Sequence, residues 1–169
     1  MNKEVLLFFG LFIALVLIQV LICNHIVLFN MAVPIVFIYF IIRLPSGLGL
    51  NWLLTFSFLL GFSVDIFSDT PGVNALACTL LAVCKRPMLY AYVPRDDRTK
   101  DIIPSLSSLG PAIYSKYLLT MVAAFCLMAF SIEYFNFANV IDIAVMASAS
   151  CVFSFVLLLG IDSLMLTKT

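Results

Sequence analysis

Residues 61–74 read GFSVDIFSDTPGVN, and they connect two long apolar runs of the sequence. The first run carries a carboxylate, Asp65, close to its end, and the Pro71-Gly72 pair then turns the chain back. A charge inside an apolar helix costs on the order of a few kcal/mol near the centre of a bilayer, and less toward its surface. A carboxylate at this position therefore predicts a specific structural or binding role for Asp65.

The composition around this stretch is typical of a membrane protein. Hydrophobic residues make up 64% of the 169 positions, and charged residues make up only 11%. A soluble domain of this size cannot enclose that much apolar surface, so we expect lipid around the chain. The formal net charge of zero argues against nucleic-acid binding. We also expect the first apolar run to remain as a helix rather than to be removed as a signal peptide.

Six apolar stretches are candidates for membrane-spanning helices, because a helix needs about 20 apolar residues to cross a bilayer. They are Val5–Cys23, Ile26–Ile42, Leu50–Ile66, Val73–Tyr92, Ala112–Ile132 and Val140–Leu166. We therefore predict an all-α, polytopic integral membrane protein that forms a single six-helix transmembrane domain over residues 1–169.

The fourth stretch is unusual because its charge-free part, Val73 to Cys84, is too short to cross the hydrocarbon core. In one interpretation Lys85 and Arg86 extend to the lipid headgroups and the helix continues at the interface. In the other, the turn from Asp65 to Asn74 dips into the membrane and is shielded by neighbouring helices. Both interpretations stay open at this point.

The distribution of cations predicts the topology. With six spans and a cytoplasmic N-terminus, all nine Lys and Arg residues fall on the cytoplasmic side and none on the outer side. Both termini are then cytoplasmic, and so is the longest connection, residues 94–111. Ile102, Ile103, Leu106 and Leu109 in this loop are spaced for a short helix on the membrane surface, and a plain loop is the alternative.

Acidic residues gather on the predicted outer side, where no Lys or Arg can pair with them. They are Asp65, Asp69, Glu133 and Asp142. Simple hydration among the headgroups accounts for the last three. For Asp65 we expect backbone amides at the start of the fourth helix as partners, with Thr70 as N-cap, Pro71 at the first helical position and Asn74 completing the hydrogen bonds. This arrangement is either a structural lock of the turn or a site that meets a protein or a ligand.

Small residues predict contacts between helices, since close packing drives helix association in lipid. Gly10 and Ala14 form one such pair, and a stripe of small residues lies in the sixth stretch, formed by Ala144, Ala147, Ser148, Cys151 and Ser154. Their partner is either another helix of this chain, which we expect, or a different protein.

Signatures of catalysis, cofactors and metals are missing from the sequence. The single histidine rules out an HExxH metal site, and there is no GxSxG motif or phosphate-binding loop. The five cysteines lack CxxC spacing and are predicted to be apolar filler. We therefore expect a protein that is not an enzyme.

The stretch from Gly61 through Asp65, Asp69, Pro71, Gly72 and Asn74 to Leu76 resembles the signature of the rod-shape-determining MreD family, approximately G-x-x-x-D-x-x-x-x-x-P-x-G-x-x-[AG]-L. The chain differs in placing Pro71 directly before Gly72. Length, the number of predicted spans and the Arg-Leu-Pro turn at residues 43–45 also resemble that family.

The resemblance implies a multi-pass protein of the bacterial inner membrane that belongs to the elongasome, the assembly for lateral cell-wall growth. Its implied partners are MreC, a RodA-type glycosyltransferase, the elongation-specific penicillin-binding transpeptidase and the actin-like MreB. Asp69 and Glu133 are then the expected contacts with MreC. The alternative is a small-molecule-binding membrane subunit of an energy-coupling-factor-type transporter, since the family's fold is thought to be similar to such subunits.

Overall fold

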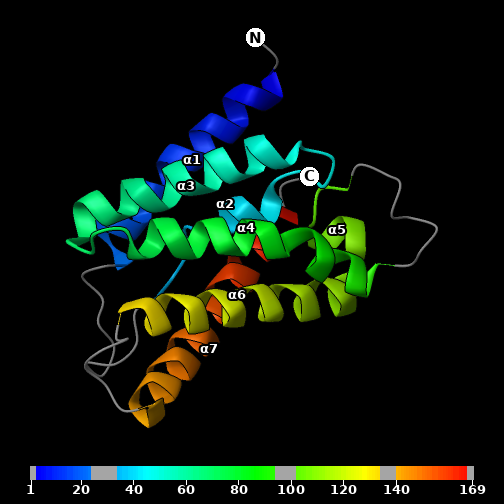
Figure 1. The fold of residues 1–169 in the computed structure, drawn as a ribbon. Coiled ribbons are helices and arrows are strands. Elements are labelled where there is room, and N and C mark those ends of the chain that lie inside the picture. The colour runs from blue at the N-terminus through cyan, green and yellow to red at the C-terminus, as the bar shows by residue number, and fades with distance from the viewer. Residues whose placement is uncertain (1–2, 24–33, 94–101, 134–139, 167–169) are drawn as a thin grey trace.

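The computed structural model describes residues 3–23, 34–93, 102–133 and 140–166, and within these ranges all regular structure is helical. Figure 1 shows how the helices are arranged. They are α1 (Lys3–Leu21), α2 (Tyr39–Arg43), α3 (Leu50–Ser68), α4 (Val73–Tyr92), α5 (Leu106–Leu109), α6 (Pro111–Glu133) and α7 (Val140–Leu166). The prediction of an all-α fold is thus confirmed for the described residues.

Five of the six predicted helices are present with bounds within two residues of the prediction. They are α1, α3, α4, α6 and α7, and the predicted bounds of α4 and α7 agree with the structure at both ends. Within the described ranges α3, α6 and residues Ala144–Ser163 of α7 are long and apolar enough to cross a membrane. These helices have the properties of transmembrane segments, whereas six spans and cytoplasmic termini remain predictions.

The outward faces of the helices are apolar, as expected for contact with lipid. Large exposed side chains occur on α1, α3 and α7, and examples are Phe9, Trp52, Ile66 and Val152, each more than 60% exposed. Apolar exposure on this scale is unusual for a soluble monomer.

The helices α3, α4 and α6 lie side by side, and α7 crosses α6 (Figure 1). Because α3 and α4 are joined by a short turn, they run antiparallel, and α4 occupies the centre between α3 and α6. The side chains that pack α4 into this position are small, including Ala77, Cys78 and Ala82, all fully buried. The layer brings the C-terminal ends of α3 and α6 and the N-terminal end of α4 together at one end of the molecule.

The predicted second span, Ile26–Ile42, is wrong in its described part. Helix α2 contains only Tyr39–Arg43, and residues 34–38 form a non-helical segment that is buried inside the protein. Residues 26–33 lie outside the described residues. Pro34 has no N–H to donate and disfavours helix in the residue before it. Apolar composition alone therefore predicted a continuous helix where the chain is irregular up to residue 38.

Side chains from two other helices satisfy the backbone of this non-helical segment. Gln19 of α1 donates from Nε2 to the carbonyl oxygen of Pro34 at 2.9 Å and accepts from the N–H of Val36 at 2.9 Å. Ser154 Oγ of α7 accepts from the N–H of Ile35 at 2.8 Å. Irregular backbone at membrane depth is tolerated only where protein surrounds it and its polar groups are paired. Gln19 and Ser154 meet that requirement.

Gln19→Leu is accordingly expected to destabilise the protein. The substitution leaves the Pro34 carbonyl and the Val36 N–H without their side-chain partner, at a cost of about 1–3 kcal/mol for each buried group. The thermal unfolding midpoint of the purified protein in detergent measures the loss. Ser148→Ala, at an exposed position of α7, is the control and should leave the midpoint unchanged. An unchanged midpoint for Gln19→Leu would show that these two hydrogen bonds do not support the segment.

The small residues behave differently in the two helices. Of the predicted stripe on α7, which packs against α6, Ala147, Cys151 and Ser154 are buried, so internal packing is confirmed for these three. Ala144 and Ser148 are exposed, and the prediction is wrong for them. Gly10 and Ala14 on α1 are exposed, and a Cβ added at Gly10 would meet nothing within 4 Å. The expectation that this pair faces another helix of the chain is wrong for the described structure.

The described part of the loop, residues 102–110, contains the one-turn helix α5. The hydroxyl of Ser105 accepts from the N–H of Ser108, and the Ser108 hydroxyl accepts in return from the N–H of Ser105. The N–H of Leu106 donates to Asp162 Oδ2 of α7 at 2.9 Å. A short helix is thus present over Leu106–Leu109 and is fixed to α7 by a hydrogen bond, whereas Ile102 and Ile103 lie before it in non-helical backbone. Its place on the membrane surface stays a prediction.

Candidate functional site

The turn between α3 and α4 contains two residues in the left-handed conformation. Asp69 ends α3 with φ of 57°, and Gly72 precedes α4 with φ of 83°. Glycine adopts a positive φ without steric cost, and Asp is one of the few other residues that tolerate it. These two positions reverse the chain within four residues.

Both carboxylate oxygens of Asp65 accept hydrogen bonds from the start of α4. Oδ1 accepts from the backbone N–H of Asn74 at 3.0 Å and from its Nδ2 at 2.9 Å. It also accepts from the hydroxyl of Thr70 at 2.9 Å, and Oδ2 accepts from the N–H of Ala75 at 2.8 Å. Asp65 is only 5% exposed. A carboxylate at the N-terminus of a helix satisfies free N–H groups and is stabilised by the helix dipole.

Gly61 lies one helical turn before Asp65 and allows the two helices to approach. A Cβ at this position would collide with the backbone of α4, where it would lie 2.6 Å from both Cα and N of Ala75. The carbonyl oxygen of Asn74 is in the way as well. Gly61 and Asp65 thus act on the same short section of α4, the first by contact and the second by hydrogen bonds.

The predicted partners of Asp65 are present, and one detail of the prediction is wrong. The N-cap of α4 is Gly72, and α4 begins at Val73, so Thr70 is not the N-cap and Pro71 lies before the first helical position. Thr70 instead donates to Asp65 from two residues before the cap. Because Asp65 reaches the free amides of Asn74 and Ala75 from the preceding helix, α4 needs no side-chain cap of its own.

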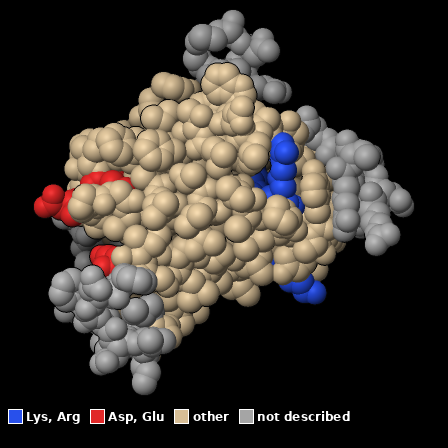
Figure 2. Space-filling view, in the orientation of Figure 1, with Lys and Arg blue, Asp and Glu red and all other residues tan. Residues whose placement is uncertain are grey.

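The two predicted partner-contact residues lie at this end of the molecule. Asp69 is exposed in the turn, and Glu133 is exposed at the end of α6. The side chain of Asp142 lies outside the described residues. Figure 2 shows Asp and Glu side chains at one end of the visible face and Lys and Arg toward the opposite end. The charge separation predicted from the sequence is therefore visible in the described part of the fold.

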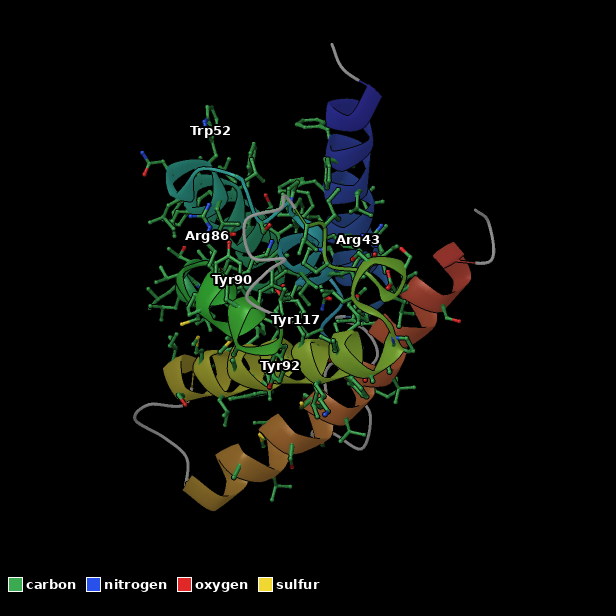
Figure 3. All side chains as sticks on the ribbon, turned by 90° about the vertical axis from the view of Figure 1, so that its right-hand side faces the viewer. Arg43, Trp52, Arg86, Tyr90, Tyr92 and Tyr117 are labelled. Carbon is green, nitrogen blue, oxygen red and sulfur yellow. The ribbon has the colours of Figure 1, made fainter. Side chains whose placement is uncertain are left out.

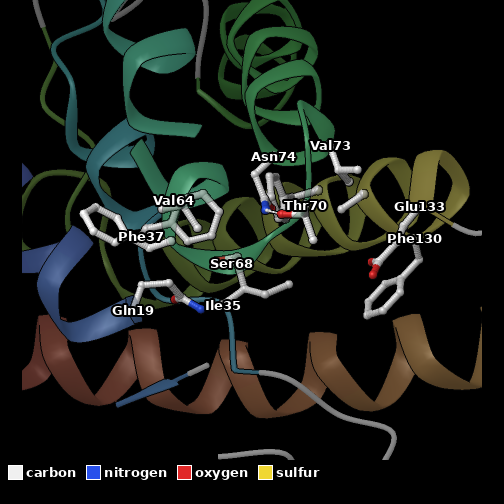
Figure 4. Close-up of a pocket in the computed structure, with 13 residues that line it drawn as sticks. Gln19, Ile35, Phe37, Val64, Ser68, Thr70, Val73, Asn74, Phe130 and Glu133 are labelled. Carbon is white, nitrogen blue, oxygen red and sulfur yellow. Dashed lines mark hydrogen bonds between the residues drawn. The ribbon is translucent and has the colours of Figure 1, made fainter. Parts of the chain in front are cut away.

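A cavity of about 410 Å³ opens beside the α3–α4 turn (Figure 4). Gln19 and Phe37 lie at one end of its lining, and Phe130 and Glu133 lie at the other (Figure 4). The remaining lining residues come from the non-helical segment before α2, the turn and the neighbouring helices; they are Ile35, Val64, Phe67, Ser68, Thr70, Val73, Asn74, Phe125 and Ala129. Pockets that hold small organic ligands have volumes of roughly 300–1,000 Å³, mostly apolar walls and a few polar groups. This cavity has those properties.

A polar cluster that was not predicted from the sequence lies at the opposite end of the molecule. Asp162 of α7 is buried and accepts from the hydroxyl of Tyr39 and from Arg43 Nη1, the latter at 3.2 Å. With the N–H of Leu106, three segments of the chain meet on this carboxylate. Asp162 is an acid within the last apolar stretch, and Arg43 directly follows the second. Both residues lie near the predicted cytoplasmic ends of their apolar stretches. This shared depth in the membrane could have indicated that they form a pair.

Lys85 and Arg86 of α4 donate hydrogen bonds to backbone carbonyls of the connection between α2 and α3. Lys85 is 1% exposed and its Nζ donates to the carbonyl oxygen of Leu44. Arg86 donates to the carbonyl oxygen of Leu48. Figure 3 views this end of the molecule and shows Arg43 and Arg86 there. The two cations of α4 stabilise the connection between α2 and α3.

Within the described residues no group of three or more His, Cys, Asp or Glu side chains could hold a metal ion. Comparisons with protein-family models, with curated proteins and with solved structures gave no match to this chain.

Proposed function

We propose that this chain is a non-catalytic scaffold of the cell-wall elongation machinery in a bacterial inner membrane, with the role of the MreD family. In this role it is needed for rod shape, because it regulates peptidoglycan synthesis through the enzymes that it holds. The proposal includes six membrane spans with both termini in the cytoplasm. The described helices and the confinement of Lys and Arg to the predicted inner segments support that topology.

The observation that carries the proposal is the exposed acidic end of the molecule. Asp69 and Glu133 lie there, while the sequence has no Lys or Arg in residues 4–42, 44–84 or 117–167. In the described part of the chain, an ion pair joins Arg43 and Asp162 at the opposite end of the molecule, far from these two acids. Charge complementarity between surfaces steers association and fixes orientation. A cationic segment of another protein, next to its membrane anchor, fits this end.

The contacts among the signature residues give the proposal a second support. Gly61, Asp65, Gly72 and Asn74 meet in one turn, so the residues that resemble the MreD signature form a single structural unit. A rigid α3–α4 hairpin holds Asp69 at a fixed place on the outer end. This is a suitable arrangement for a protein whose activity is to present a surface.

The resemblance supplies the proposed partners. MreC meets Asp69 and Glu133 on the outer side, and the RodA-type glycosyltransferase and the elongation-specific transpeptidase join the same assembly. MreB approaches from the cytoplasm at residues 94–111. Of this loop, residues 94–101 lie outside the described residues.

Replacing Asp69 by Asn and Glu133 by Gln together is expected to weaken recovery of MreC from solubilised native membranes severalfold. The charges are lost while size and hydrogen-bonding capacity are kept, and Asn still tolerates the positive φ of position 69. The amount of MreC that is recovered with the tagged chain measures the effect. Pro71→Ala, at an exposed position of the same turn, is the control and should recover MreC normally. Unchanged recovery with the double variant would refute this contact.

A small-molecule-binding subunit of an energy-coupling-factor-type transporter is the second candidate function, and the cavity beside the turn is the observation that favours it. Mass spectrometry of the proteins that are purified with the tagged chain separates the two. MreC with a wall polymerase or transpeptidase supports the scaffold. A pair of ATPases with a coupling membrane subunit supports the transporter.

A further inference from the structure

The cavity beside the α3–α4 turn is an open pocket of ligand size. Its volume is about 410 Å³, and pockets that hold small organic ligands have volumes of roughly 300–1,000 Å³. Because α3, α4, α6 and the buried segment at residues 35–37 all contribute to its walls, the cavity belongs to the packed part of the fold.

The inner part of the lining is apolar and aromatic. Phe37 and Phe125 are buried and meet edge to face with ring centroids 5.5 Å apart, and Val64 is buried beside them. The amide of Gln19 also lies at this end, but its two polar atoms already bond to Pro34 and Val36. An occupant of this part therefore contributes hydrocarbon or an aromatic ring rather than a polar group.

The opposite end of the lining has a carboxylate next to an aromatic ring. Glu133 and Phe130 lie there together (Figure 4). A carboxylate and an aromatic face both attract an organic cation, and the attraction to the ring adds about 0.5–2 kcal/mol. The other polar groups of the lining, on Ser68, Thr70 and Asn74, are neutral.

The charges around the cavity disfavour an anionic ligand. The sequence has no Lys or Arg in residues 4–42, 44–84 or 117–167, and these ranges include every lining residue. A phosphate or carboxylate ligand would therefore meet the carboxylate of Glu133 without a compensating lysine or arginine, and like charges repel each other.

We propose that this cavity binds an organic monocation with an apolar body, whose ammonium group lies at Glu133 and whose body lies against Phe37, Val64 and Phe125. The site is separate from Asp69, which does not line the cavity. The binding of such a ligand does not require the scaffold role, and it deepens the second candidate function if that one holds.

Three probes that share an apolar phenylalkyl body and differ in their head group test this proposal. They are added to the full chain in lipid nanodiscs. They are 4-phenylbutylammonium, 4-phenylbutanol and 4-phenylbutyrate, and calorimetry measures their dissociation constants. The ammonium probe is expected to bind at least tenfold more tightly than the alcohol, and the carboxylate should bind most weakly. Equal affinity for the three heads, or no binding of any probe, would overturn the proposal.

Substitutions in the lining test whether the probes bind in this cavity. Glu133→Gln should remove the preference for ammonium over alcohol, and Asp69→Asn, as the matched acid outside the cavity, should keep it. Ala129→Phe fills the cavity and should abolish binding of all three probes. If Ala129→Phe does not accumulate in the membrane, Val73→Phe at a half-buried lining position replaces it. A preference that survives Glu133→Gln, or binding that survives the filling variant, contradicts the proposed site.

The same variants distinguish ligand binding in the cavity from the proposed contact with MreC. Filling the cavity at position 129 is expected to leave recovery of MreC unchanged, while the Asp69→Asn change should not affect probe binding. Failure of one proposal can therefore be recognised without reference to the other.

Discussion

Gly61→Leu is expected to prevent stable folding, so that little of the chain accumulates in the membrane fraction. Even a single added carbon at this position would lie 2.6 Å from Cα and N of Ala75, and these are backbone atoms of a helix that cannot rotate away. To relieve the clash, α3 and α4 must separate, which also pulls Asp65 away from the amides of Asn74 and Ala75. Gly61→Ala should show a smaller loss, about 1–3 kcal/mol by analogy with overpacked cores.

The matched control for this prediction is Gly10→Ala on α1. A Cβ at Gly10 would meet nothing within 4 Å, and alanine in a helix is favoured over glycine by about 0.5–1 kcal/mol. Membrane accumulation and the thermal midpoint in detergent should therefore be unchanged or slightly increased. Equal behaviour of the alanine variants at positions 10 and 61 would mean that the close approach of α3 and α4 is not required.

Asp65→Leu is expected to have the second-largest effect. Leucine suits the apolar surroundings, but it leaves the N–H groups of Asn74 and Ala75 and the hydroxyl of Thr70 without their acceptor. Each buried donor left unsatisfied costs about 1–3 kcal/mol. The total approaches the whole stability of a typical domain. We expect a large loss of protein from the membrane fraction and a lowered thermal midpoint for what remains.

Two further substitutions separate hydrogen bonding from charge. Asp65→Asn keeps one acceptor oxygen and should lose less stability than Asp65→Leu. Asp69→Leu, at an exposed position, should lose least, about 1–2 kcal/mol from the positive φ of 57° that leucine disfavours. An effect of Asp69→Leu as large as that of Asp65→Leu would contradict the structural role assigned to Asp65.

The sequence predicted the positions of most helices because their signals are local. Apolar runs of the right length, interrupted by Pro, Gly or charged residues, gave the bounds of α4 and α7 at both ends. The partners of Asp65 were also predictable, since a carboxylate a few residues before a turn can reach only the amides that follow it. The N-cap was placed wrongly because Thr70 and Gly72 both suit that position and only the geometry of the turn selects between them.

Contacts between distant segments were not predictable from one sequence. The segment at residues 34–38 has the composition of a membrane helix, but Gln19 and Ser154 provide its backbone with other partners. Neither side chain is close to it in the sequence. The cavity has the same origin, because its lining comes from residues between 19 and 133 that share no common pattern.

The sequence by itself determined that this chain is helical and apolar, that Lys and Arg are absent from residues 4–42, 44–84 and 117–167, and that Asp65 needs partners at the turn. These properties follow from composition, charge placement and short-range spacing, which act on each segment separately. Only the tertiary structure decided that Lys85 and Arg86 bond to carbonyls inside the protein, that Asp162 joins Arg43, and that Glu133 lines a cavity. The physical reason is that polar groups removed from water must find partners, and which groups are within reach depends on how all the helices pack.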